Sequence, residues 1–162
     1  LFLGVMATVT ADTWATELGT LSAAPPRLIT SGRVVEVGTS GGVSPLGTSV
    51  SLGGGLLIGL TAGVLSALAG HVGWGAALLV AVIGALSGAI GSLLDSLMGA
   101  TVQQIYYCDT CRKETERRVH RCGTTTRPLR GWSWVNNDLV NLLSSLGGGL
   151  AAAGLAAWWL VW

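Results

Sequence analysis

Charged side chains are scarce in this 162-residue sequence, in which Asp, Glu, Lys and Arg together make up 10% of the residues. A soluble domain normally carries about a quarter of its residues in these four types. The formal net charge is +1, so the basic excess typical of nucleic-acid binding is also absent. The composition therefore argues against an ordinary soluble domain, and we expect no nucleic-acid partner.

The features of a signal peptide are missing from the start of the sequence. No basic segment precedes the apolar run that begins at Leu1, and no small-residue cleavage site follows it. The run also begins without Met. We therefore expect the sequence to start inside a helix, as a fragment that lacks the N-terminal helices of a longer protein.

Apolar residues, glycine and tryptophan are what the sequence has in abundance. Half of the residues are hydrophobic, 25 are Gly, and the 7 Trp outnumber the 2 Tyr and 1 Phe together. Glycine is frequent where membrane helices pack closely, and Trp is frequent where they meet lipid headgroups. The composition predicts an all-α, polytopic transmembrane helix bundle in a lipid bilayer, with residues 1–162 as a single membrane domain.

Four apolar segments predict the helices of this bundle. A helix needs roughly 20 apolar residues to cross the hydrocarbon core of a bilayer. The short segment around His71 leaves room only for a tight turn, so the two middle helices should form an antiparallel hairpin. The fourth ends in Trp158, Trp159 and Trp162, an interfacial aromatic cluster. The predicted helices cover residues of about 1–18, 49–70, 74–105 and 138–162.

Two polar loops separate these helices, at about 19–48 and 106–137. They contain all nine Lys and Arg residues, whereas the turn at His71 contains none. Two membrane passes lie between the loops, so both should lie on the same side. The positive-inside rule predicts that this side is cytoplasmic.

Acidic residues within or beside the apolar segments are candidates for function, because an ionisable group in a membrane helix is costly. Asp12, Glu17 and Asp95 are such residues, and the apolar segments contain no Lys or Arg to pair with them. This pattern suggests that a cation arrives from outside, as Mg²⁺ or as protons. Asp138, at the start of the fourth helix, fits a helix cap as well as it fits a site. The alternative for Asp12 is a residue that packs between helices.

Small residues indicate the direction in which Asp95 points. Gly84, Gly88 and Ser92 recur at intervals of four on one helix face, and Asp95 lies beside them, so it should point into the bundle. Asp12 and Glu17 are five residues apart and would diverge on a regular helix. They could share one metal ion only if the helix ends or breaks near Gly19.

The first loop contains a Gly-rich turn, Gly38-Thr-Ser-Gly-Gly-Val-Ser44. Backbone N–H groups in such a turn can bind phosphate oxygens, with help from hydroxyl groups and Arg. The turn is not a Walker A motif, and taken alone it fits a flexible loop. Because acidic candidates for Mg²⁺ lie elsewhere in the chain, we interpret it as a phosphate-binding turn. The candidate phosphate-binding residues are Arg27, Arg33, Thr39, Ser40, Gly41 and Gly42.

The second loop contains a Cys-x-x-Cys pair followed by His-x-Cys. Cys108, Cys111, His120 and Cys122 supply four ligands, enough for a closed tetrahedral Zn²⁺ site in a small zinc-knuckle-like hairpin. A cytosolic loop would keep thiols reduced, which favours a structural metal over a disulfide. A redox pair, or inert thiols, remains the alternative.

Carboxamides mark the entry into the fourth helix. Asn137 and Asn141 share one face of this helix. They are candidates for catalytic contacts with a nucleotide or a metal, and they fit hydrogen bonds between helices equally well.

Five motifs stand in this order along the sequence: Thr10-Ala-Asp-Thr-Trp-Ala-Thr-Glu-Leu-Gly19, Pro26-Arg-Leu-Ile-Thr30, Gly38-Thr-Ser-Gly-Gly-Val-Ser44, Gly91-Ser-Leu-Leu-Asp-Ser-Leu-Met-Gly-Ala100 and Asn136-Asn-Asp-Leu-Val-Asn141. Together they resemble an integral membrane family catalogued as domain of unknown function 92, which includes transmembrane protein 19 and phytyl-phosphate kinase-like proteins. The resemblance covers nearly the whole sequence. It implies a polytopic membrane protein and, for the plant member, phosphoryl transfer from a nucleoside triphosphate to a prenyl monophosphate.

The leading hypothesis is a prenyl-phosphate or prenol kinase (a transferase) at the cytoplasmic membrane face. In it, Asp12, Glu17 and Asp95 hold Mg²⁺ with a nucleoside triphosphate, and an isoprenoid lipid is the acceptor. One alternative is a proton- or cation-coupled transporter, which would use the same acids but would not need the phosphate-type loop. The other is a non-catalytic membrane subunit, in which replacing the acids should matter little.

Overall fold

Four helices and two small sheets alternate along the chain. The computed structural model describes residues 1–161, with their side chains as far as residue 159; Trp162, the predicted end of the fourth helix, lies outside the described residues. The helices are α1 (Phe2–Gly19), α2 (Pro45–Leu68), α3 (Trp74–Thr101) and α4 (Asn137–Val161). The strands are β1 (Arg27–Leu28), β2 (Gly42–Val43), β3 (Ile105–Cys108), β4 (Lys113–Thr115) and β5 (Arg127–Arg130).

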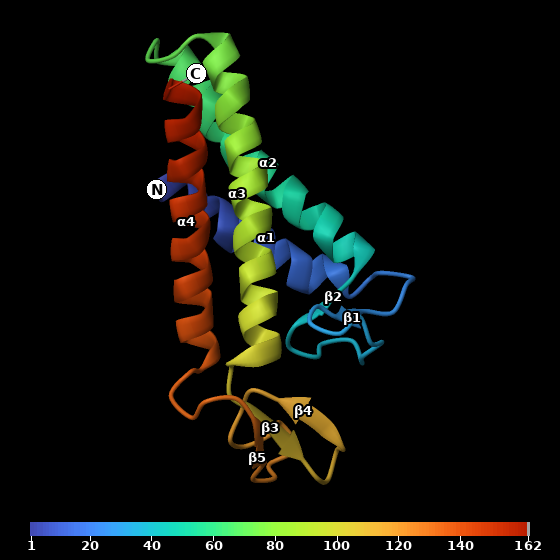
Figure 1. Cartoon of the computed structure of the whole chain (residues 1–162). Coiled ribbons are helices and arrows are strands. Elements are labelled where there is room, and N and C mark those ends of the chain that lie inside the picture. Colours follow the sequence, from blue (N-terminus) through green and yellow to red (C-terminus); the bar gives the residue numbers. More distant parts are fainter. Residues whose placement is uncertain (162) are drawn as a thin grey trace.

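Three of the helices are long and apolar enough to cross a membrane. They are α2, α3 and the part of α4 from Asn137 to Trp159. Helix α1 crosses them obliquely and contacts all three (Figure 1). The predicted transmembrane helix bundle is therefore confirmed in its helical part.

The strands correct the expectation of an all-α fold. In the first loop, β1 and β2 pair antiparallel, with Arg27 opposite Val43. In the second loop the strand order is β4-β3-β5, so this loop is a three-stranded sheet rather than a simple hairpin. The third helix was expected to run to residue 105, but Ile105 opens β3. The Ile-Tyr-Tyr sequence that follows favours a strand because its β-branched and aromatic side chains suit a pleated sheet.

Helix α2 begins earlier than its apolar run, at Pro45. The side chain of Ser44 caps it, accepting a hydrogen bond of 3.0 Å from the backbone N–H of Gly47. Proline suits the first helical position because its missing N–H would have no partner there. The Ser44 hydroxyl also donates a hydrogen bond of 3.4 Å to the carbonyl of Gly19, so the end of α1 is linked to the start of α2.

Glycine allows the backbones of α2 and α3 to touch. A Cβ atom on Gly59 would lie 2.7 Å from the carbonyl oxygen of Ala81, and one on Gly84 would lie 2.6 Å from the Cα of Gly59. Real Cβ atoms do not approach other atoms so closely. In a membrane, where helix association rests on packing rather than on the hydrophobic effect, this contact is a major part of what holds the hairpin together.

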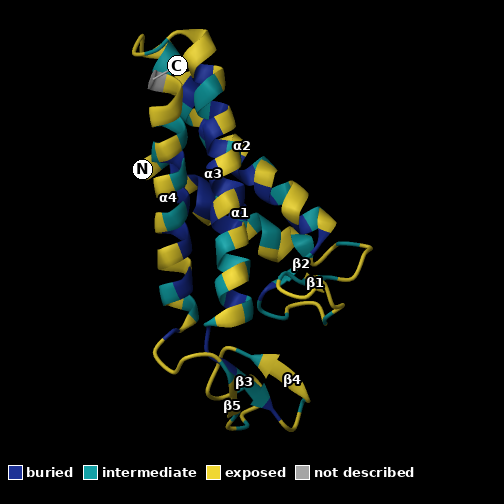
Figure 2. Ribbon diagram, viewed as in Figure 1, coloured by how far each residue is buried: buried dark blue, intermediate teal, exposed yellow. Residues whose placement is uncertain are grey.

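The outer faces of the bundle are apolar, with tryptophan at both ends. Many Leu, Val and Ile side chains of α2, α3 and α4 are exposed. Exposed positions run along the outward sides of these helices in Figure 2. At the loop end, Trp132 and Trp134 stack with their ring centroids 5.6 Å apart. At the other end, Trp74, Trp158 and Trp159 are exposed. Trp prefers the headgroup region, so we expect these two groups to lie near the two membrane surfaces.

Both polar loops lie at the same end of the bundle, as the count of membrane passes predicted (Figure 1). Arg130, at the end of β5, joins them, because its Nη2 donates a hydrogen bond of 3.1 Å to the carbonyl of Ser40 in the first loop. The turn that contains His71 lies at the opposite end.

The glycine contact between α2 and α3 predicts a large effect of a small substitution. Gly59→Val should lower the free energy of unfolding by about 1–3 kcal/mol, because the added methyl groups must separate the two helix backbones. The measurement is reversible unfolding of the protein in detergent. Gly154→Val on the exposed face of α4 is the matched control, since a Cβ there meets no atom within 4 Å. Equal stability of the two variants would contradict this account of the interface.

Candidate functional site

A cavity of ≈ 380 Å³ lies where the helix ends meet the two polar loops. Its wall is built from the second half of α1, the start of α2, the second half of α3, the start of α4 and parts of both loops. Most of the residues singled out in the sequence line it together, namely Asp12, Glu17, Asp95, Asn137, Asn141, Thr39, Ser40, Gly41 and Gly42.

Two carboxylates reach this cavity from different helices, and each accepts a hydrogen bond from a serine on another helix. Asp12 on α1 accepts a hydrogen bond of 3.1 Å at Oδ1 from the hydroxyl of Ser92 on α3. Asp95 on α3 accepts one of 3.0 Å at Oδ2 from the hydroxyl of Ser144 on α4. Both side chains are half-buried, and the two carboxylates interact electrostatically. Asp95 thus points into the bundle, as the row of small residues predicted.

The wall of the cavity is acidic. Asp12, Glu17, Asp95 and Glu116 line it, and among the described residues no Lys, Arg or His does so. Helix α1 stays regular as far as Gly19, and these acids do not form a compact set of three or more metal ligands within residues 1–161. A divalent cation held here would therefore take one or two carboxylates and complete its shell with other oxygens, which is the habit of Mg²⁺ at phosphate sites.

The Gly-rich turn leaves two of its amides available. The N–H of Thr39 donates to the carbonyl of Glu36 at 3.1 Å, and that of Gly42 donates to the carbonyl of Thr39 at 2.9 Å. The N–H groups of Ser40 and Gly41 donate no backbone hydrogen bond within residues 1–161. Gly41 has a φ of +83° and rests against Ala100, so a side chain there would be both strained and obstructed.

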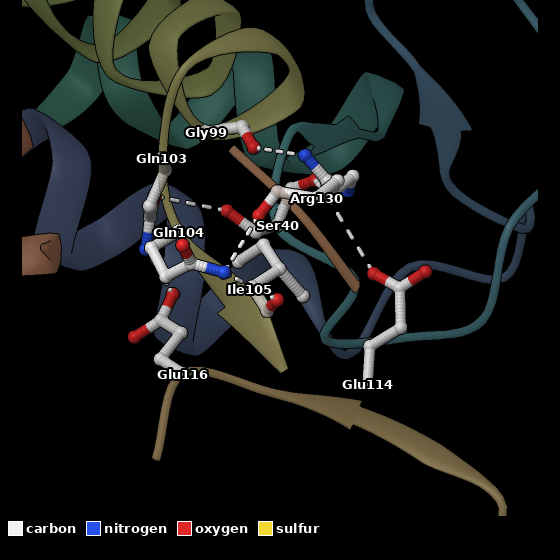
Figure 3. A network of polar contacts seen from close by, with 8 residues as sticks. All are labelled: Ser40, Gly99, Gln103, Gln104, Ile105, Glu114, Glu116 and Arg130. Atoms are coloured by element: carbon white, nitrogen blue, oxygen red, sulfur yellow. Dashed lines mark hydrogen bonds and ion pairs between the residues drawn. The ribbon is translucent and has the colours of Figure 1, made fainter. Parts of the chain in front are cut away.

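Arg27 and Arg33 are not part of the cavity wall. Both are exposed, and Nη1 of Arg27 donates a hydrogen bond of 2.8 Å to the carbonyl of Gly32 within its own loop. Arg130, which was not a candidate from the sequence, is the arginine that hydrogen-bonds residues next to the cavity. Its Nη1 donates to the carbonyl of Gly99 at 2.7 Å, and its guanidinium lies 3.6 Å from the carboxylate of Glu114 (Figure 3).

Gln103, which was also not a candidate from the sequence, connects the first loop, the second loop and α4. Its side chain is 1% exposed. Its Oε1 accepts a hydrogen bond of 3.1 Å from Ser40, and its Nε2 donates to Glu116 at 2.8 Å and to Asn137 at 3.5 Å. Figure 3 shows Gln103 between Ser40 and Glu116. The only signal in the sequence was a polar pair, Gln103 and Gln104, directly after a long apolar helix.

Glu116 is the fourth acid of the cavity. The chain carries it into the wall just beyond β4, and the hydrogen bond from Gln103 fixes its carboxylate. In the sequence it stands between charged residues of the second loop and resembles an ordinary solvated side chain. Only the folding of the three-stranded sheet against the helix ends brings it to the site.

The asparagines at the start of α4 are a cap, which precedes the helix, and a pair that lines the cavity. Oδ1 of Asn136 accepts a hydrogen bond of 2.9 Å from the N–H of Leu139, which caps α4. Asn137 and Asn141 line the cavity. Asp138 is exposed and lies outside the cavity wall. It is in the first turn of α4, where its negative charge interacts favourably with the helix dipole.

The cysteines and His120 of the second loop form a compact cluster. One ligand atom from each of Cys108, Cys111, His120 and Cys122 lies within 4.8 Å of the others, so the cluster could hold a metal ion. Hydrogen bonds with the hydroxyl of Thr124 and the ring of His120 lower the pKa of the Cys122 thiol to about 5. The pKa of Cys111 is raised to about 11, chiefly by its hydrogen bond with Cys122.

Fold and site together define a polytopic helical membrane protein with an acid-lined cavity at one end of its bundle. The chain belongs to the integral membrane protein family DUF92, whose model matches residues 1–149. This confirms the family resemblance. No solved structure matches the chain significantly.

Two curated relatives extend the comparison. The chain is 37% identical to Protein PGR of Arabidopsis thaliana over 147 residues, which cover 89% of this chain and 50% of that protein. It is 38% identical to the uncharacterized membrane protein MJ0933 of Methanocaldococcus jannaschii over 103 residues, 64% of this chain and 40% of that protein. The chain thus spans half or less of the length of these relatives.

The central place of Gln103 predicts that its loss loosens both loops. In Gln103→Met, the side chains of Ser40, Glu116 and Asn137 lose their hydrogen bonds with the buried amide of Gln103. This loss should lower the free energy of unfolding by about 1–3 kcal/mol. Hydrogen–deuterium exchange should accelerate in residues 38–42 and 114–117.

Thr101→Val is the matched control for this substitution. It removes an exposed hydroxyl whose hydrogen bond is local, to the carbonyl of Leu97 at 2.7 Å. Exchange in both loops should stay as in the unsubstituted protein. If Gln103→Met also left exchange unchanged, Gln103 would not be what holds the two loops together.

Proposed function

We propose that this chain carries the active site of a membrane lipid kinase, which transfers a phosphoryl group from a nucleoside triphosphate to a prenyl monophosphate or a prenol. Two things support the proposal. One is the resemblance of the sequence to its family, which implies such a reaction for the plant member. The other is the cavity, which offers carboxylates and free amides where membrane helices meet polar loops.

The observation that carries the proposal is the unbalanced charge of the cavity. Four carboxylates line it and no basic side chain does so among the described residues. Carboxylates repel a phosphate, so we expect an anionic substrate to enter this cavity together with a divalent cation. A Mg²⁺ ion held by Asp12 and Asp95, with Glu17 nearby, fits this donor set, because Mg²⁺ binds phosphates through one or two carboxylates. When bound, it would neutralise the charge of the transferring phosphoryl group.

The chain's own residues would position the substrates. The N–H groups of Ser40 and Gly41 would donate hydrogen bonds to phosphate oxygens, because they have no partner in the loop. Thr39 and Gly42 shape that turn. The carboxamides of Asn137 and Asn141, which also line the cavity, would donate to the nucleotide. Phosphoryl transfer depends mainly on such positioning and on charge neutralisation, which makes a strong catalytic base unnecessary.

An isoprenoid tail has a route to this cavity from the membrane. Leu93 on α3 lines the cavity and is also one of the exposed apolar side chains of the bundle. A lipid whose headgroup lies among the carboxylates could therefore keep its tail on the apolar faces of the helices. In this proposal the loops, and hence the nucleotide, lie on the cytoplasmic side, as the positive-inside rule predicts.

The central test is transfer of label from γ-labelled CTP or ATP to a panel of prenols and prenyl phosphates, using the intact membrane protein with Mg²⁺. Asp95→Asn should reduce transfer at least about a hundredfold, because the neutral amide cannot hold the cation that neutralises the phosphates. Asp138→Asn is the matched control, since it makes the same change on an exposed acid outside the cavity and should leave transfer intact.

The outcomes of this test separate the candidate functions. Mg²⁺-dependent labelling that Asp95→Asn alone abolishes supports the kinase. Full activity of Asp95→Asn would refute the assigned site. A well-folded protein that labels nothing in the panel would refute the proposed reaction and favour a proton- or cation-coupled carrier, to be tested by flux into vesicles.

The arginines of the first loop give a second prediction. In this proposal Arg27 and Arg33 have no role in phosphate binding, because they lie outside the cavity wall. Arg33→Gln should therefore leave the KM for the nucleotide within about twofold of that of the unsubstituted protein, as expected for a surface substitution. A KM raised tenfold or more would return Arg33 to the phosphate site.

A further inference from the structure

The second loop folds as a sheet with almost no core of its own. Its strands have four, three and four residues. Between Ile105 and Arg130 the buried side chains are Ile105 and Cys108, whereas Val119 and Leu129 are exposed. A unit this small cannot gain enough from apolar burial to order itself, and small domains of this kind usually need a disulfide or a metal.

The cysteines of this loop are arranged for a metal rather than for a disulfide. All three are free, and an odd number cannot be fully paired within the chain. The Sγ atoms of Cys108 and Cys122 are 3.6 Å apart, and Nδ1 of His120 is 3.1 Å from Sγ of Cys122. Two sulfurs bound to one tetrahedral Zn²⁺ ion are separated by about 3.8 Å. The observed spacing is therefore close to that of a metal site.

The backbone turns back after each half of the cluster. Arg112, directly after Cys111, has a φ of +53° and is the only non-Gly residue with positive φ among the described residues. Gly123, directly after Cys122, has a φ of +85°. A left-handed conformation in a residue such as Arg costs energy and persists only where something enforces it. Paired reversals of this kind direct both sets of ligands toward one point.

We propose that Cys108, Cys111, His120 and Cys122 bind one structural Zn²⁺ ion, and that this ion positions Glu116 in the wall of the cavity. The ligands come in two pairs, and the segment between them, residues 112–119, contains Glu116. Joining the pairs fixes both ends of this segment, so that Glu116 meets Gln103 at 2.8 Å. With all four positions of the metal occupied by protein, no site is left for substrate, which makes the ion structural.

This inference does not depend on the proposed kinase function, because zinc binding and the position of Glu116 can be measured without any activity. The first measurement is the metal content of the intact membrane protein by mass spectrometry. We expect about one zinc per chain, lowered to background in Cys111→Ser, because the remaining three ligands hold the metal less tightly. His71→Ala, which replaces the other histidine at the opposite end of the bundle, should retain the zinc.

The second measurement uses the unsubstituted protein, so that it remains valid if Cys111→Ser fails to fold. Replacing the metal with Co²⁺ should produce the visible absorption of a tetrahedral thiolate site. Removing the metal with a chelator should accelerate hydrogen–deuterium exchange in residues 112–119 but leave α2 unchanged. A protein without zinc and without the cobalt spectrum would refute the site. Zinc retained in Cys111→Ser would refute the ligand set, and exchange unaffected by the chelator would refute the positioning of Glu116.

Discussion

The contact on which the rest of the bundle depends is the crossing of α1 with α3 and α4 at Thr8. The Thr8 side chain is fully enclosed, and its hydroxyl donates a hydrogen bond of 3.4 Å to the carbonyl of Ser87. Gly91 on α3 and Gly148 on α4 provide the space, since a Cβ on either would collide with Thr8. One helical turn further along α1, this crossing places Asp12 opposite the serine that binds it. The geometry of the acid-lined cavity thus follows from where three helices can touch.

The helices and the direction of Asp95 were predictable because both depend on local periodicity. An apolar run of sufficient length predicts a membrane helix, and small residues at intervals of four mark the face that another helix approaches. Asp95 lies on that face and meets Ser144. The helix bounds were less predictable where a cap or a strand intervened. Ser44 and Pro45 begin α2 ahead of its apolar run, and the aromatic segment after α3 forms β3.

The other half of the site could not be predicted, because its residues meet through contacts distant in sequence. Gln103 and Arg130 join the first loop to the second across 63 and 90 residues, and nothing in their neighbours indicates those partners. Residue type alone suggested Arg27 and Arg33, yet the turn of their own loop leaves both exposed. Glu116 was hidden among charged neighbours, because a sheet of such short strands has no pattern by which its faces can be recognised.

The helix packing that brings the carboxylates of the cavity together also gives them few hydrogen-bond donors. Asp12 and Asp95 each accept one hydroxyl hydrogen bond from a side chain, and Asp95 also experiences the charge of Glu116. Half-buried acids that repel one another raise the free energy of the empty cavity. In the proposed kinase, a divalent cation would relieve this repulsion, and a phosphate would then balance the charge of the cation. Under that proposal, binding of metal and phosphate would be mutually cooperative, and helix packing that concentrates negative charge would favour an anionic lipid headgroup only through the cation.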